Sequence, residues 1–167
     1  MTPAKELETL KKRLQYLEDM EGIRQTLHSY SHTIDYGPFE DWANVFSPDG
    51  VFDVFRIDGA KVHKENGRSD LRRYLATKKL PPDLYDKHLI CSPVVEIKGN
   101  TAKVESYIVM LRETSGEGAR VYAWGRYHDT LVKRGGKWLI KERLAEMETG
   151  AGKVYSGPPP AGGGTRK

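Results

Sequence analysis

The chain has little cysteine and no long apolar run, and each shortage excludes a class of protein. Its one cysteine, Cys91, has no second thiol in the chain to pair with, which is typical of proteins from a reducing cytoplasm. The longest uninterrupted apolar stretch, Tyr107–Leu111, is far shorter than a bilayer span. The first residues mix charges without an apolar core, so no export signal is predicted. We therefore expect a cytoplasmic protein without membrane contact.

Positive charge is in slight excess but is not concentrated. The 167 residues include 27 Lys and Arg against 23 Asp and Glu, a formal net charge of +4. Three of the basic residues and none of the acidic ones lie in 149–167, which leaves 24 basic against 23 acidic residues elsewhere. A phosphate-binding face, and with it a nucleic-acid partner, is not expected. Because 149–167 is rich in glycine and proline, we predict one domain over 1–148 and a flexible tail over 149–167.

The first part of the chain is patterned as a helix. Thr2-Pro3 suits the N-cap and the first helical position, and apolar residues then recur every three or four positions over Leu7–Ile34. Gly22 is expected to bend or split this helix, and Tyr36-Gly37-Pro38 to end it. The first part could form a coiled coil, but one long surface helix that caps a sheet is favoured.

After this helix the pattern changes from helical spacing to alternation. Two tight turns, Gly99-Asn100 and Gly135-Gly136, separate long strand-like segments. Helices followed by a meander of antiparallel strands predict an α+β domain, in which a curved sheet wraps around the N-terminal helices as a cone. The interior of such a cone suits a small hydrophobic molecule. The expected elements are helices over 39–46 and 67–80, a turn over 47–50, and strands over 51–57, 87–98, 101–113, 119–133 and 137–147.

Polar residues among apolar neighbours are the candidates for chemistry. Asp35 is either a turn residue or a buried carboxylate, and His88 is either a structural histidine or a base. A carboxylate on one imidazole nitrogen fixes the tautomer and stabilises the imidazolium that forms. His28 and His32 share a helix side with Asp35, but a solvated polar face explains them better than a metal site, so no metal is expected. No activated nucleophile is evident, which favours direct proton abstraction over covalent catalysis.

Short motifs in chain order carry a resemblance to a known family. The motifs are Tyr30-x4-Asp35, Trp42, Phe46-x2-Asp49-Gly50, Gly67-Arg68, His88, Gly125-x-Tyr127-x-Asp129 and Trp138-x-Ile140. With these motifs, the chain over roughly residues 5–147 resembles the SnoaL-like group of the nuclear-transport-factor-2-like (NTF2-like) superfamily, which includes scytalone dehydratase and other lyases.

The resemblance implies roles for individual residues. In lyases of the family an Asp at the end of the first helical segment orients a His on the facing strand, and the matching residues here are Asp35 and His88. Tyr30 is implied as a hydrogen-bond donor to a substrate oxygen or the leaving group. Arg143 lies near a position where some members use a basic residue to draw off negative charge. The substrate-binding candidates are Trp42, Tyr107, Tyr127 and Arg143, although the two tyrosines could equally be ordinary sheet aromatics.

The resulting hypothesis is a cofactor-independent lyase, most simply a dehydratase, that acts on a small hydrophobic cyclic or aromatic molecule. One alternative is an isomerase or cyclase with the same His-Asp pair, and another is a non-catalytic ligand-binding or structural subunit. The strand over 101–113 lacks the second cavity histidine of scytalone dehydratase, which argues against that enzyme's own reaction. Family members are commonly dimers or trimers built on the outer sheet face, so we expect a homodimer or homotrimer with Tyr122 and Trp124 in its interface.

Overall fold

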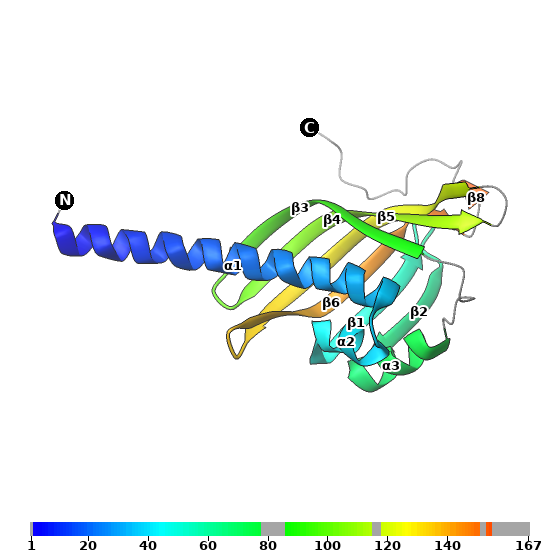
Figure 1. The fold of residues 1–167 in the computed structure, drawn as a ribbon, viewed down its shortest axis with the longest axis horizontal. Coiled ribbons are helices and arrows are strands. Elements are labelled where there is room, and N and C mark those ends of the chain that lie inside the picture. The colour runs from blue at the N-terminus through cyan, green and yellow to red at the C-terminus, as the bar shows by residue number, and fades with distance from the viewer. Residues whose placement is uncertain (1, 78–85, 115–117, 151–152, 155–167) are drawn as a thin grey trace.

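The computed structural model describes residues 2–77, 86–114, 118–150 and 153–154. Within these ranges, helices accompany one large sheet and a short two-stranded ladder (Figure 1). The elements are α1 (Pro3–Tyr36), α2 (Phe39–Val45), β1 (Phe46–Arg56), β2 (Lys61–Asn66), α3 (Gly67–Thr77), β3 (Asp86–Lys98), β4 (Thr101–Thr114), β5 (Gly118–Arg134), β6 (Lys137–Met147), β7 (Thr149–Gly150) and β8 (Lys153–Val154).

The large sheet is curved and does not close on itself (Figure 1). Its strand order is β2-β1-β6-β5-β4-β3, so β2 and β3 are its edges. β1 and β6 run parallel, and the other neighbouring strands run antiparallel. With helices on one face of a curved sheet, this is the predicted α+β cone, and the fold class is confirmed.

The core lies between the C-terminal half of α1 and the inner face of the sheet (Figure 1). Ile23, Leu27 and Tyr30 of α1 are fully buried there. Five aromatic rings pack against one another with centroids 5.3–6.4 Å apart, mostly edge to face, as ring quadrupoles favour. This aromatic cluster consists of Tyr30, Trp42, Phe46, Phe52 and Tyr127.

The prediction that Gly22 bends or splits the first helix is wrong, because α1 is one continuous helix. Gly22 instead permits a close approach to the sheet: a Cβ at this position would lie 2.8 Å from Cδ1 of Trp138. Trp138 cannot easily yield, since it is buried and its indole N–H donates to Asp19 Oδ1 at 2.9 Å. The glycine therefore serves packing between α1 and β6, a role that helical periodicity does not reveal.

The turn predicted over 47–50 is also wrong, because these residues belong to β1. Phe46 pairs with Ile140 and Val51 with Glu142, so β1 has four residues between these pairs where β6 has one. Pairing with β6 overrides the local turn preference, and the four turn-forming residues form a bulge in β1. Strand β2 was not predicted at all, since it is an exposed, charge-rich edge strand without apolar alternation.

The remaining elements follow the prediction closely. Strands β3 to β6 match the expected segments to within one residue, with turns at Gly99-Asn100 and Gly135-Gly136. The last three residues of the helix predicted over 67–80 lie outside the described residues, and α3 ends at Thr77. In the described part of the predicted tail, β7 pairs with β8, and the Thr149 hydroxyl accepts a hydrogen bond from the Trp124 backbone N–H at 2.8 Å. Within the described ranges, no helix is long and apolar enough to cross a membrane.

Candidate active site

Asp35 lies in the last turn of α1, where its charge is unfavourable. The helix ends at Gly37-Pro38, and the Gly37 N–H donates to the Thr33 carbonyl at 3.0 Å. The C-terminal end of a helix dipole stabilises cations and opposes carboxylates, and the last turn of α1 has no basic residue. The side chain of Asp35 is nevertheless only 6% exposed. Such a local conflict needs a compensating partner and is typical of functional sites.

The partner is His88 on the edge strand β3. The imidazole Nδ1 lies 2.5 Å from Asp35 Oδ1, and the backbone N–H of His88 donates to Asp35 Oδ2 at 2.9 Å. Both oxygens of one carboxylate thus bind the same residue. The imidazole is 12% exposed, so the pair is largely shielded from water. The structure thus brings Asp35 and His88 together, and their catalytic roles stay a prediction.

This contact assigns the protons of the imidazole. An ionised carboxylate only accepts hydrogen bonds, so Nδ1 carries the hydrogen that points at Asp35. In the neutral ring, Nε2 then has a free lone pair, and it makes no hydrogen bond to the residues that the structure describes. A histidine held in this way can take a proton at Nε2, and the carboxylate stabilises the cation that results.

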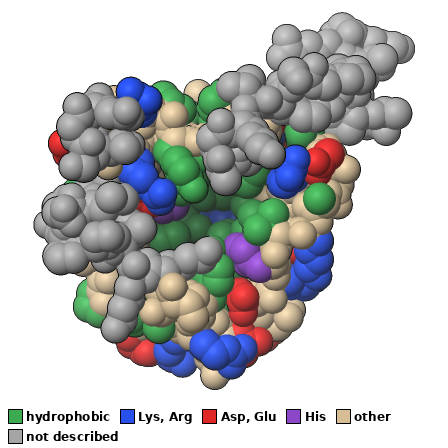
Figure 2. All heavy atoms as spheres, turned by 90° about the vertical axis from the view of Figure 1, so that its right-hand side faces the viewer, with side chains coloured by type: hydrophobic (Ala, Val, Ile, Leu, Met, Phe, Trp, Pro, Cys, Tyr) green, Lys and Arg blue, Asp and Glu red, His purple; other side chains and the backbone are tan. Residues whose placement is uncertain are grey.

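The pair faces a cavity of about 390 Å³, large enough for a small organic molecule. The cavity lies at the end of the cone where α1 ends and β3 begins, and Figure 2 shows this end hollowed, with hydrophobic side chains on the walls and histidines near the rim. Its walls combine apolar residues with a few polar groups. They are formed by Ile34, Asp35, Tyr74, Leu75, Thr77, Asp86, His88, Met110, Arg112 and Tyr122.

A second charged pair lines this cavity and was not predicted. Asp86 and Arg112 are direct cross-strand partners on β3 and β4, joined by two hydrogen bonds of 2.6 and 2.5 Å. The guanidinium also lies over the ring of Tyr122, 3.9 Å from its centroid. Because Asp86 binds the guanidinium in a bidentate manner, it raises the pKa of Arg112 and fixes a permanent cation in the wall. The sequence signal was an arginine directly after the apolar run Tyr107–Leu111.

The side chain of Tyr122 lies on a different face of the sheet from the one predicted. It was predicted on the outer face, but it lines the cavity, because β5 contains an extra residue opposite β4 at this point. Met110 pairs with Ala123 and Leu111 with Val121, which leaves Tyr122 as the bulged residue. Trp124, the other residue predicted there, is 37% exposed.

Tyr107 is also misplaced by the prediction. Residues directly opposite each other on antiparallel strands point to the same face, and Tyr127 pairs with Ser106, whereas Tyr107 pairs with Arg126. Tyr127 and Ser106 are accordingly buried, and Tyr107 is 55% exposed on the outer face. The prediction that Tyr107 lines the cavity is therefore wrong, since a one-residue step along a strand reverses the face.

The other predicted site residues form a buried polar layer deeper in the cone. The guanidinium of Arg143 binds Asp129 through hydrogen bonds of 2.8 and 2.6 Å, with both side chains fully buried. It is stacked between two rings, 3.9 Å from the centroid of Tyr30 and 4.0 Å from that of Tyr127. Burial disfavours the charge, but Asp129 more than offsets this and raises the pKa of Arg143.

The hydroxyls of both tyrosines in this layer stay protonated, because burial disfavours the phenolate. Burial raises the pKa of the Tyr30 hydroxyl, and the charge of Arg143 only partly opposes the effect. Burial likewise raises the pKa of Tyr127 well above its ordinary value. Tyr30, Trp42, Tyr127 and Arg143 are not among the side chains that line the described cavity, so their contact with a substrate stays a prediction.

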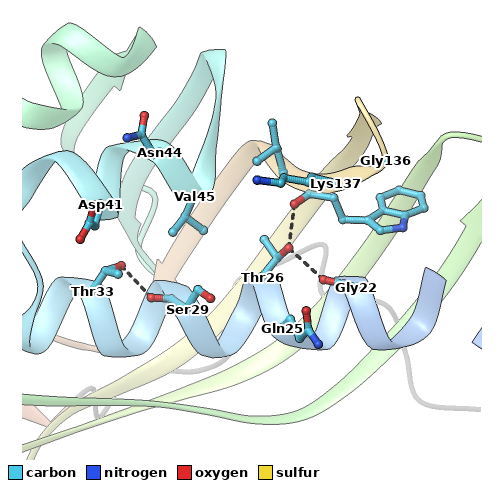
Figure 3. A pocket seen from close by; sticks show the side chains of 12 residues that line it. Gly22, Gln25, Thr26, Ser29, Thr33, Asp41, Asn44, Val45, Gly136 and Lys137 are labelled. Atoms are coloured by element: carbon cyan, nitrogen blue, oxygen red, sulfur yellow. Dashed lines mark hydrogen bonds between the residues drawn. The ribbon is translucent and has the colours of Figure 1, made fainter. Parts of the chain in front are cut away.

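A second opening, of about 470 Å³, lies between α1, α2 and the turn from β5 to β6 (Figure 3). It contains the joint between helix and sheet, where the Thr26 hydroxyl donates to the Trp138 carbonyl at 2.7 Å. Polar side chains such as Ser29 and Asn44 line it from the two helices. Its described lining includes no histidine, so it offers no base comparable to His88.

The histidines of α1 do not gather metal ligands. Across the described parts of the chain, no three His, Cys, Asp or Glu side chains lie close enough to hold a metal ion together. The imidazole of His28 instead contacts Arg24 at 3.2 Å on the helix surface. Cys91 is half-buried, and its thiol lies 3.8 Å from the Leu89 carbonyl.

The curved sheet, its helices and the cavity at one end define an NTF2-like protein. The chain belongs to the SnoaL-like family, since residues 15–144 match the SnoaL-like domain. No curated protein matches the chain significantly.

Solved structures share the fold. A protein of unknown function from Mycobacterium tuberculosis is 28% identical, with a TM-score of 0.69 over 88% of this chain and 76% of that one. An NTF2-like protein with a cystatin-like fold from Novosphingobium aromaticivorans is 22% identical, with a TM-score of 0.75 over 87% of this chain and 92% of that one. A protein from the same organism, assigned to the β subunits of aromatic-ring-hydroxylating dioxygenases, is 21% identical, with a TM-score of 0.67 over 77% of this chain and 88% of that one. The fold thus occurs in enzyme subunits and in proteins of unknown function.

Proposed function

We propose that this protein is a cofactor-independent lyase that removes water from a small hydrophobic cyclic or aromatic molecule. The observation that carries the proposal is the double contact between Asp35 and His88 in the wall of a cavity that apolar and charged residues line together. Asp35 occupies an unfavourable helix end to hold the ring, and the free Nε2 remains available for a substrate. A merely structural histidine would not require this arrangement.

The proposed reaction needs one base that later acts as an acid. The Nε2 of His88 takes a proton from a carbon next to a carbonyl, and the electrons of the C–H bond form the enolate. The enolate then expels the hydroxyl from the neighbouring carbon, which takes the proton from Nε2 and leaves as water. Asp35 stabilises the imidazolium between the two steps, and each proton transfer of this kind contributes on the order of 10²–10⁴-fold in rate.

Other wall residues would serve binding and charge. The fixed cation of Arg112 favours a substrate oxygen that becomes negative, and the apolar Met110 and Leu75 favour a hydrophobic ring. Tyr30 was expected to donate to the departing hydroxyl, but its buried hydroxyl is not part of the described cavity wall. The proposal therefore gives that donation to His88.

The experiment is a panel of cyclic β-hydroxy ketones incubated with the purified protein and analysed by mass spectrometry. Elimination lowers the product mass by one water, whereas isomerisation leaves it unchanged and would support the isomerase alternative. We expect His88→Ala and Asp35→Asn to lose on the order of 10²-fold or more in rate while remaining folded. His128→Ala is the matched control, because His128 lies on the outer face against Glu146. Turnover that survives in His88→Ala would contradict the proposal.

A further inference from the structure

The N-terminal half of α1 extends beyond the sheet (Figure 1). A row of leucines in this half is uncovered. Leu7, Leu10, Leu14 and Leu17 are 54, 54, 57 and 63% exposed. Their spacing of three, four and three residues places them on one stripe of the helix, at the two apolar positions of a heptad. We call this row the leucine stripe. Exposed leucines at both apolar positions of two successive heptads indicate that a partner normally covers them.

The chain's own sheet cannot cover the leucine stripe. At 100° per residue, its direction differs by about 150° from that of Ile23, Leu27 and Tyr30, which pack on the sheet. The apolar row changes sides near Met20, because three steps of three residues follow one another from Leu14 to Ile23. Leu7, Leu10 and Leu14 therefore point away from the globular domain, whereas Leu17 lies at its edge, in a pocket that Pro93 and Val95 of β3 also line.

We propose that the leucine stripe pairs with the same stripe of a second copy of this chain in a parallel two-stranded coiled coil. The leucines take positions a and d of the heptad, and the flanking positions g and e decide the orientation. In a parallel pair, Glu6 faces Lys11 of the partner subunit, and Arg13 faces Glu18 of the partner subunit. Both contacts join opposite charges, and the twofold symmetry repeats each of them.

The antiparallel arrangement of the same leucines is disfavoured by charge. It would place Lys11 against Lys11 of the partner subunit, and Arg13 against Arg13 of the partner subunit. Like charges in these positions destabilise a coiled coil and exclude the wrong orientation.

The first test is the mass of the full chain by size-exclusion chromatography with light scattering. Leu10→Glu combined with Leu14→Glu is expected to halve the mass of the wild-type particle. Residues Thr9 and Tyr16 are exposed on the other side of the helix, so Thr9→Glu with Tyr16→Glu adds the same charge and should retain the wild-type mass. The altered leucines lie in an exposed part of the helix, so circular dichroism should show a folded domain in every variant. Equal masses for wild type and the leucine variant would overturn the proposal. This holds also if both proteins assemble through the sheet face, because the leucine stripe would then contribute nothing to the assembly.

The second test concerns the orientation. With Cys91 replaced by serine, Leu10→Cys places one thiol per chain at a position that meets itself only in a parallel pair. Oxidation with copper phenanthroline should give a covalent dimer, and Thr9→Cys should give little. A cross-link that forms only when Leu10→Cys and Leu14→Cys proteins are mixed would show the antiparallel arrangement and overturn the proposal.

Discussion

The two oxygens of the Asp35 carboxylate bind two different groups of His88, the ring Nδ1 and the backbone N–H. The backbone contact fixes the strand relative to the end of α1, and the ring contact fixes the imidazole relative to the strand. His88 is therefore positioned without help from a substrate. Such preorganisation lets the base meet a substrate in one orientation, so little reorganisation is needed during the reaction.

This geometry predicts one tautomer for His88. In ¹⁵N-histidine-labelled protein, the neutral ring should carry its proton on Nδ1. The signal of this proton should be strongly deshielded by its hydrogen bond to Asp35, and His88→Gln should remove it. In Asp35→Asn the ring should lose this preference, because an amide can donate as well as accept. Nuclear magnetic resonance of the imidazole nitrogens measures both. A neutral ring protonated on Nε2 would contradict the arrangement.

The buried pair of Asp129 and Arg143 predicts a large asymmetry between single and double variants. Asp129→Leu leaves a fully buried, unpaired guanidinium and should lower the free energy of unfolding by about 3–5 kcal/mol. Asp129→Leu with Arg143→Met removes both charges and should cost less than the single change. Urea denaturation measures each value. A double variant less stable than Asp129→Leu would show that the charge pair is not what the single change disrupts.

The close packing of Gly22 predicts that Gly22→Ala changes the free energy of unfolding in the direction opposite to the one that helix propensity predicts. Glycine to alanine within a helix ordinarily stabilises by about 1 kcal/mol, but here the new methyl group meets Trp138. Overpacking of this kind costs about 1–3 kcal/mol, so Gly22→Ala should lower the free energy of unfolding. In a Trp138→Leu background the clash is gone, and the same substitution should stabilise. Thermal and urea denaturation of the wild type, the two single variants and the double variant measure these effects. A stabilising Gly22→Ala in the wild type would refute the packing role.

Asp19 predicts a pH dependence of stability. Burial acts to raise its pKa, but hydrogen bonds from Lys133, Trp138 and Gln15 outweigh this and lower the pKa below 3.8. A carboxyl whose pKa is depressed on folding stabilises the protein above its unfolded pKa and loses this effect as pH falls. The stability difference between wild type and Asp19→Asn should thus be largest at neutral pH and shrink below about pH 4. A difference that grows in acid would have the wrong sign.

How far the sequence could predict this protein differs between local and tertiary features. The hairpin turns, long strands and α1 follow from spacing and turn residues, because neighbours in the chain determine them. The pair of Asp35 and His88 was anticipated from polar residues among apolar ones and from the family resemblance. Its double contact could not be predicted, because it depends on where β3 meets the end of α1.

The errors share one physical cause. Tyr107 and Tyr122 were assigned to the wrong faces because strand register and the β5 bulge decide which way a side chain points. Gly22 and the bulge within β1 depend on β6, which lies more than eighty residues further along the chain. Pairing between distant segments overrides local preference at each of these positions.

The most direct test of the account is hydrogen exchange at carbon, with a ligand that can lose a proton but has no leaving group. Cyclic and ring-fused ketones without a β-hydroxyl, incubated with the protein in D₂O, should gain deuterium next to the carbonyl, as followed by mass spectrometry. Wild type and His128→Ala should both catalyse this exchange, and His88→Ala should catalyse it on the order of 10²-fold or more slowly. Exchange as fast in His88→Ala as in the wild type would contradict the assignment of His88 as the base.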